Sequence, residues 1–272
     1  NRGFAAPVRL RMPMTPAERA RVVEVERDGF ARWDALQGLA LDVLMARAGE
    51  AVPGLGDVDA AEAALSVAIG VLLADADAHP AFVAECLALP DFDTLADAVA
   101  VIDPIELLAA REGLLDRLAV AHRIALRVRF EALRDAAAGG IDDVAMAARS
   151  LRHAALGWLS RVDGGDAARE LWREARTMTA RLAALRALLH VRAEGHEAAR
   201  AAFEAEFIEH PLVTDKWIAL VATRPHPDAL VDIEALLAGP HWLPTNPNRV
   251  RALIGSVARS NPMVFHRVDG AG

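Results

Sequence analysis

Most of the chain carries the hydrophobic spacing of amphipathic helices. Between residues 104 and 138, apolar residues recur at spacings of seven, four, three, four, three and four, which places them on one helical face. They are Leu107, Leu114, Leu118, Ala121, Ala125, Val128 and Ala132. A similar stripe is formed by Met178, Leu182, Leu185 and Leu189. Because each apolar face has to be covered, the pattern predicts helices packed on helices.

Local signals indicate where several helices begin. Residues 15–18, Thr-Pro-Ala-Glu, offer an N-cap, a proline at the first helical position and a glutamate able to reach back to the cap amide. Residues 103–106, Asp-Pro-Ile-Glu, repeat this arrangement. Asn246 and Asn261 each precede a proline, so they are predicted N-caps as well.

Breaks at proline and glycine separate these segments into helices of about 10 to 20 residues joined by short connections. No repeat of about 33 to 47 residues recurs residue for residue. The predicted fold is therefore all-α, an irregular array of antiparallel helix hairpins that is α-solenoid-like. No Pro/Ser-rich linker divides residues 15–272, which are predicted to form one helical domain.

The start of the chain has a different pattern. Residues 4–12 alternate between apolar and polar positions, as in a half-buried β-strand. A single strand cannot satisfy its own edges, so we expect the rest of its sheet upstream of residue 1. The chain also begins without methionine and without a signal-peptide pattern, so we expect it to be a piece of a longer chain.

Composition excludes several classes of protein. The 272 residues are 54% hydrophobic and 25% charged, a balance typical of globular proteins, and the net charge of −8 disfavours binding to nucleic acid. No apolar stretch reaches the roughly 20 residues that cross a bilayer, so no membrane partner is predicted. Cys86 is the only cysteine, which suits a reducing compartment and makes the cytoplasm the default location. Lys216 is the only lysine, and we attribute the excess of arginine to coding bias.

Candidate catalytic motifs are incomplete. Residues 196–200 begin like the zinc motif H-E-x-x-H, but Arg200 stands where the second histidine is needed, and arginine does not bind a cation. Cys86 lies in an apolar helical context without a basic neighbour in sequence, so it is predicted to pack rather than react. We therefore predict no catalytic, cofactor or metal site within this chain.

Several segments, in order along the whole chain, resemble the C-terminal part of bacterial aminopeptidase N (alanyl aminopeptidase), a zinc metallopeptidase family. The strongest is residues 246–255, Asn-Pro-Asn-Arg-Val-Arg-Ala-Leu-Ile-Gly. The other segments are residues 4–8, 30–35, 102–105, 212–217, 261–262 and 265–266.

The resemblance implies a parent enzyme that uses zinc to remove N-terminal amino acids from peptides. Residues 1–14 then correspond to the last strand of an upstream β-sandwich, and residues 15–272 to most of the C-terminal helical domain, truncated at its C-terminal end. The zinc ligands belong to the upstream catalytic domain and have no matching position here, so this chain alone is expected to be inactive. Its expected partners are that catalytic domain, whose active site it caps, and the peptide substrate.

By the same resemblance, Asn246, Asn248 and Arg249 are candidates for residues that meet the catalytic domain or line a cavity. On chemistry alone, the favoured interpretation of this segment is a helix cap. A stand-alone helical-repeat module that binds protein partners is the alternative function. An enzyme with an unrecognised site ranks third.

Overall fold

The computed structural model describes residues 13–77 and 79–271, and every regular element within these ranges is a helix. The predicted all-α fold is confirmed for this part of the chain. The predicted strand over residues 4–12 lies outside the described residues. The chain divides into two compact units: unit 1 contains residues 1–102 and 109–158, and unit 2 contains residues 103–108 and 159–272.

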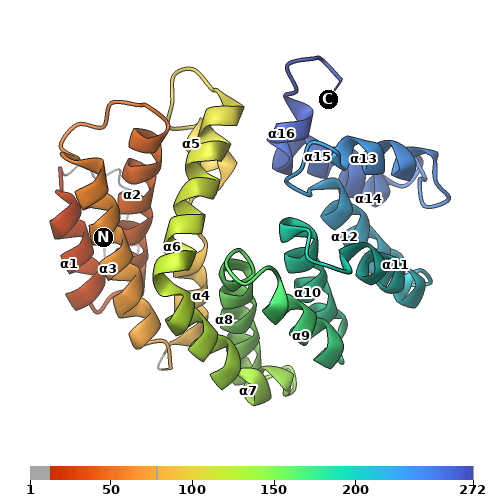
Figure 1. Cartoon of the computed structure of the whole chain (residues 1–272), viewed down its shortest axis with the longest axis horizontal. Coiled ribbons are helices and arrows are strands. Elements are labelled where there is room, and N and C mark those ends of the chain that lie inside the picture. Colours follow the sequence, from red (N-terminus) through yellow and green to blue (C-terminus); the bar gives the residue numbers. More distant parts are fainter. Residues whose placement is uncertain (1–12, 78, 272) are drawn as a thin grey trace. The chain divides into compact units, whose positions relative to one another are not determined.

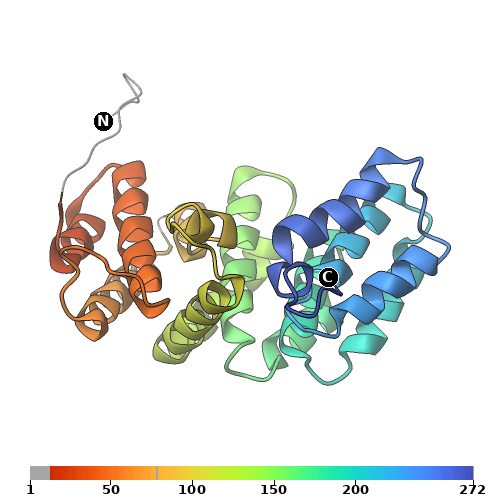
Figure 2. The same cartoon turned by 90° about the horizontal axis from the view of Figure 1, so that it is seen from above.

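Unit 1 is built from the first half of the helices (Figure 1). In chain order they are α1 (Pro16–Val25), α2 (Gly29–Arg47), α3 (Val58–Ala74), α4 (Pro80–Leu87), α5 (Phe92–Ala96), α6 (Pro104–Ala132), α7 (Arg134–Ala138) and α8 (Asp143–Leu159). The first residues of α6 and the last residue of α8 are grouped with unit 2. Helices α1, α2 and α3 pack side by side (Figure 2), and Val23 of α1 is buried together with leucines of α2 and α3 in the core of this unit.

The predicted helix starts are confirmed. The amide of Thr15 donates to Oε2 of Glu18 at 2.7 Å, and the amide of Glu18 donates to Oγ1 of Thr15 at 3.3 Å, which together form a capping box. At the start of α6, Oδ1 of Asp103 accepts hydrogen bonds from the amides of Ile105 and Glu106 at 3.0 and 3.2 Å. These contacts satisfy amide groups that have no partner within the helix.

The apolar stripe predicted along residues 104–138 is correct only in its first half. Leu118 is buried, but Ala121 and Val128 are exposed, whereas Leu126 and Phe130 are fully buried instead. From Leu107 to Ala132 the predicted positions keep to the α-helical period of about 3.6 residues, so they lie on one face of a straight helix. The core covers a different face of the second half of α6, where the ring of Phe130 lies against the guanidinium of Arg152 on α8. The predicted helix is also interrupted, since α6 ends before α7 begins.

Two polar side chains in the core of unit 1, Arg152 and Trp158, form hydrogen bonds to backbone carbonyls. Arg152 is 5% exposed; its guanidinium lies 4.5 Å from the ring centre of Phe130, and its Nε donates to the Phe130 carbonyl at 3.1 Å. Nε1 of Trp158 donates to the carbonyl of Leu87 at 3.2 Å. These bonds join α8 to α6 and α4.

Unit 2 contains shorter helices. They are α9 (Asp166–Glu174), α10 (Met178–Val191), α11 (His196–Phe207), α12 (Pro211–Ala222), α13 (Ala229–Ala238), α14 (Pro247–Val250), the π-helix η2 (Arg251–Gly255), α15 (Ser256–Ser260) and α16 (Pro262–Phe265). Helix α12 is central to this unit, because it contacts α10, α11, α13, η2 and α15.

The predicted cap Asn261 also fixes the end of α12. Its Oδ1 accepts from the amide of Val264, at the start of α16. Its Nδ2 donates to the carbonyls of Ala222 and Arg224, at 2.9 and 3.1 Å. One buried amide therefore satisfies groups at two helix ends.

The face of α6 that packs in the core can be tested by a matched pair of substitutions. We expect Leu126→Ala to lower the free energy of unfolding by about 3 kcal/mol, because it leaves a cavity in a closed core. Val128→Ala, on the exposed face, should change it by less than about 0.5 kcal/mol. Urea unfolding of both variants measures the difference. Equal losses of stability would show that Val128 packs in the core, as the sequence pattern predicted.

Candidate functional site

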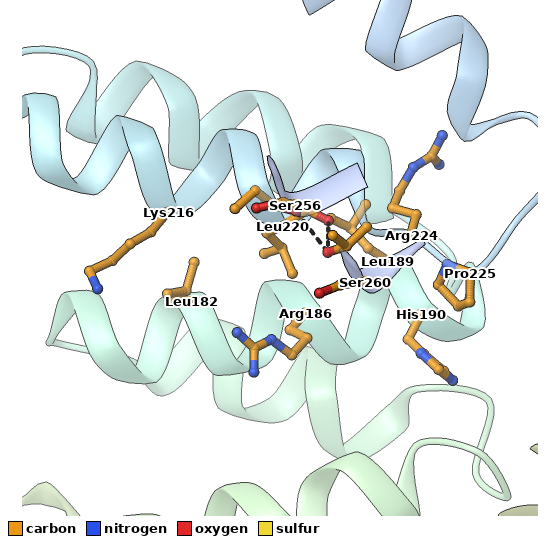
Figure 3. A pocket seen from close by; sticks show the side chains of 12 residues that line it. Leu182, Arg186, Leu189, His190, Lys216, Leu220, Arg224, Pro225, Ser256 and Ser260 are labelled. Carbon is orange, nitrogen blue, oxygen red and sulfur yellow. Dashed lines mark hydrogen bonds between the residues drawn. The ribbon is translucent and has the colours of Figure 1, made fainter. Parts of the chain in front are cut away.

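A cavity of ≈ 500 Å³ in unit 2, between α10, α12 and α15, has a size that suits a ligand (Figure 3). This volume falls within the range of small-molecule sites in proteins. The residues that line it are Leu182, Arg186, Leu189, His190, Lys216, Ala219, Leu220, Thr223, Arg224, Pro225, Ser256 and Ser260.

Helical spacing explains why these side chains meet. On α10, Arg186 follows Leu182 by four residues, and on α12, Leu220 follows Lys216 by four, so each pair lies on one helix face. The two serines of α15 are also four residues apart. Helices α10 and α12 thus each contribute charged and apolar side chains to the cavity, and α15 contributes two hydroxyl groups.

The polar lining of the cavity is positive. No aspartate or glutamate is among the lining residues, which include Arg186 and Lys216. Both of these side chains belong to exposed residues, and neither forms a salt bridge with any described residue. Nε2 of His190 contacts Nη1 of Arg161 at 2.7 Å, which requires this nitrogen to accept. Two uncompensated cations therefore face the cavity from two helices.

The acidic residue next to Lys216 is engaged elsewhere. Oδ1 of Asp215 lies 2.9 Å from Nε of Arg249, and Arg249 is only 8% exposed. The two atoms are not aligned for a hydrogen bond, and neither has another partner among the described residues. The contact is therefore a largely buried ion pair, which links α12 to α14 and neutralises Asp215.

The buried cation at the end of α12 is also paired. Arg224 is 5% exposed and forms a salt bridge with Asp232, whose other oxygen accepts from Nη1 of Arg200 at 2.7 Å. Close by, His226 contacts the carbonyl of His190 through Nε2 at 2.8 Å. Burial, assisted by the charge of Arg192, lowers the pKa of His226, so this ring adds no charge near neutral pH.

The candidate residues from sequence lie beside the cavity helices. Oδ1 of Asn246 accepts from the amides of Asn248 and Arg249 at 3.0 and 3.4 Å, which confirms Asn246 as an N-cap. Asn248 is exposed, and Arg249 is paired with Asp215 within unit 2. The cavity itself is lined by other residues. A contact of these three residues with another domain stays a prediction.

The incomplete zinc motif forms salt bridges instead. His196 is the first residue of α11; its Nε2 lies 3.2 Å from Oε1 of Glu197, and Glu197 also pairs with Arg200 at 2.9 Å. In residues 13–77 and 79–271, no three His, Cys, Asp or Glu side chains gather in a way that suits a metal ion. Nor is any helix of these ranges long and apolar enough to span a bilayer.

Sequence reasoning missed Arg186 and Lys216. Leu182 and Leu189, which line the cavity, were recognised as part of an apolar stripe. No sequence motif identifies the polar residues of the lining, because they come from three different helices. The signal in the sequence was that the single lysine, Lys216, lies four residues before the apolar residue Leu220. This spacing alone is a weak indication of a site.

Comparisons with known proteins agree with the fold. Residues 16–272 match the family described as "Domain of unknown function (DUF3458_C)" ARM repeats. The chain is 37% identical to aminopeptidase N of Caulobacter vibrioides over 281 residues, covering 100% of this chain and 31% of that protein. It is 32% identical to aminopeptidase N of Escherichia coli, covering 99% of this chain and 31% of that protein.

A solved structure shows the same fold. The crystal structure of Legionella pneumophila aminopeptidase A in complex with aspartic acid matches with a TM-score of 0.80. The match covers 98% of this chain and 32% of that chain, at 21% sequence identity. The chain therefore spans about a third of the length of the relatives it matches.

Helix packing and the family match define an ARM-repeat helical domain, and the chain belongs to this DUF3458_C family. Within that class, the particular relationship is to aminopeptidase N, whose relatives align along the whole chain. The resemblance to a C-terminal domain of aminopeptidase N, noted from sequence motifs, is confirmed.

The ion pair beneath the candidate segment can be tested by stability. We expect Arg249→Ala to lower the free energy of unfolding by about 3 kcal/mol, because it leaves Asp215 without its ion-pair partner in a largely buried place. Arg251→Ala, two residues along on an exposed side chain, is the control and should change it by less than about 0.5 kcal/mol. In urea unfolding, Asp215→Ala combined with Arg249→Ala should cost less than the sum of the single changes. Additive losses would contradict the pairing.

The packing role of Cys86 gives a second test. Cys86 is fully buried, and burial raises the pKa of its thiol to about 12, although the charge of Arg32 opposes the shift. We expect iodoacetamide at pH 8 to leave the folded chain unmodified and to alkylate it in urea, as followed by mass spectrometry. Rapid alkylation without urea would show that this thiol is open to solvent.

Proposed function

We propose that this chain is the non-catalytic C-terminal helical domain of a zinc-dependent aminopeptidase that removes N-terminal amino acids from peptides. It caps the active site of an upstream catalytic domain and restricts access of substrates. The carrying observation is that two aminopeptidases N align with at least 99% of this chain, while the aligned part is only 31% of each relative. The proposal assigns the chemistry to the remaining part of such a protein.

The zinc and its ligands belong, in this proposal, to the catalytic domain. The one segment of this chain that resembles a zinc motif has an arginine in place of the second histidine, and that arginine is engaged in salt bridges. The peptide substrate and the catalytic domain are the proposed partners, and the cytoplasm is the proposed location. A net charge of −8 argues against nucleic acid as a partner.

Exposed residues support a role in domain contact. Asn248 is exposed beside its cap residue Asn246, and Arg249 holds this segment against α12. We assign Asn246 and Asn248 to the surface that meets the catalytic domain or borders the substrate cavity, with Arg249 supporting this segment from beneath. On α6, Val120 and Ile124 form an apolar stripe that is 61% and 72% exposed, which also suits coverage by another domain.

The second candidate is a stand-alone helical-repeat module that binds protein partners. The ARM-repeat description of the family favours it, because stacked helical repeats commonly present binding surfaces. The two candidates differ in what surrounds the chain. Only the first requires a catalytic domain in the same protein.

Hydrolysis of alanine p-nitroanilide by the full-length gene product and by this chain, side by side, separates the two candidates. We expect activity only in the full-length protein, because the zinc domain supplies the chemistry, and we expect a zinc chelator to abolish it. Activity of this chain alone at the same rate would contradict the non-catalytic role. If the full-length protein is silent with every N-terminal residue tried, the binding module becomes the better explanation.

A further inference from the structure

We propose that the cavity between α10, α12 and α15 binds a carboxylate group whose adjoining apolar chain packs against the leucines of α10 and α12. The ligand class is a small N-acylated amino acid or the carboxyl end of a peptide. The proposal goes beyond the domain's capping role and does not depend on the activity of the parent enzyme.

Charge is the first argument. Although the chain is acidic overall, this cavity is lined by Arg186 and Lys216 and by no carboxylate. Most cations elsewhere in unit 2 have acidic partners: Arg181 pairs with Glu206 at 3.1 Å, for example. Two cations left uncompensated at one cavity attract an anion into it.

Neighbouring acids cannot supply that anion. Asp215 adjoins Lys216 in sequence but is held by Arg249. Asp232, near the end of α12, is held by Arg200 and Arg224. The residues that would otherwise neutralise the cavity are thus bound to other arginines, and the cavity keeps its positive charge.

Size and lining favour an organic acid over a bare ion. The cavity measures ≈ 500 Å³, whereas a water molecule occupies only about 30 Å³ in the liquid, so a simple oxyanion would leave most of it unfilled. Leu182, Leu189 and Leu220 supply apolar surface beside the cations. A ligand that has both a carboxylate and an apolar group can bind the cations and pack against the leucines.

The side chains differ in how they suit a carboxylate. The planar guanidinium of Arg186 can donate two parallel hydrogen bonds, and Lys216 supplies a compact charge. Ser256 is engaged with the carbonyl of Arg251 at 3.3 Å, which leaves Ser260 as the hydroxyl of α15 without a partner among the described residues. Figure 3 shows these groups projecting from three helices around the cavity.

The single lysine allows a direct test. With [13C,15N]-lysine as the only labelled amino acid, the 272-residue chain gives the NMR signals of one side chain, that of Lys216 in the cavity. The probes are N-acetyl-leucine, which has the carboxylate and the apolar group, N-acetyl-leucinamide, which lacks the charge, and inorganic phosphate, which lacks the apolar group.

We expect N-acetyl-leucine to shift the Lys216 signals in a saturable way, with an affinity at least about fivefold higher than that of either other probe. Raising the salt concentration from 50 to 200 mM should weaken the binding, because the cations are exposed. Phosphate that binds as tightly as N-acetyl-leucine would overturn the proposal in favour of a general anion site. The absence of any saturable shift would overturn it altogether.

Two matched substitutions test the role of Arg186 and keep Lys216 as the NMR reporter. Arg186→Gln should weaken N-acetyl-leucine about fivefold, because it removes a charged donor from the cavity. Arg176→Gln removes an exposed cation of the same unit outside the cavity and should leave the affinity unchanged. Equal effects of the two variants would show that net charge alone, not this cavity, attracts the ligand. Circular dichroism of each variant confirms that both remain folded.

Discussion

The ion pair of Asp215 and Arg249 is the contact on which the arrangement of unit 2 depends most. It joins the middle helix of the unit to the short helix that precedes the π-helical turn and α15. Two charges in a largely buried position stabilise a structure only while they remain together, because either one alone loses its hydration without compensation. The pair therefore ties α12 to α14, the short helix that leads to the α15 wall of the cavity, and it leaves Lys216 without Asp215 as a partner.

Unit 2 contains both buried cations that are paired with carboxylates and exposed cations that are not. Buried arginines such as Arg224 are matched to carboxylates, whereas Arg186 and Lys216 at the cavity are exposed and have no carboxylate partner among the described residues. Exposed pairs add little to stability, so an unmatched exposed cation costs the fold little and remains available for another role. The fold thus separates arginines that hold helices together from cations that can meet a ligand.

Local chemistry made the helix starts predictable, because a cap involves residues three positions apart. The starts at Thr15 and Asn246 follow from the sequence for this reason. The core face of α6 was less accessible: the predicted stripe keeps the helical period, but the core covers another face of the second half of the helix and buries Leu126 instead of Val128. The site around Lys216 was beyond sequence reasoning, because its residues come from three helices separated by loops, and no motif connects them.

The π-helix from residues 251 to 255 makes chain length, rather than side-chain identity, important for the third wall of the cavity. A π-helical turn accommodates one more residue than an α-helical turn. If the same residues formed an α-helix instead, the additional residue would rotate everything that follows by about 100°. Ser256 and Ser260 would then leave the cavity without being altered themselves. In related chains, a gap of one position in this segment is therefore compatible with both serines at the cavity, provided that the segment is α-helical.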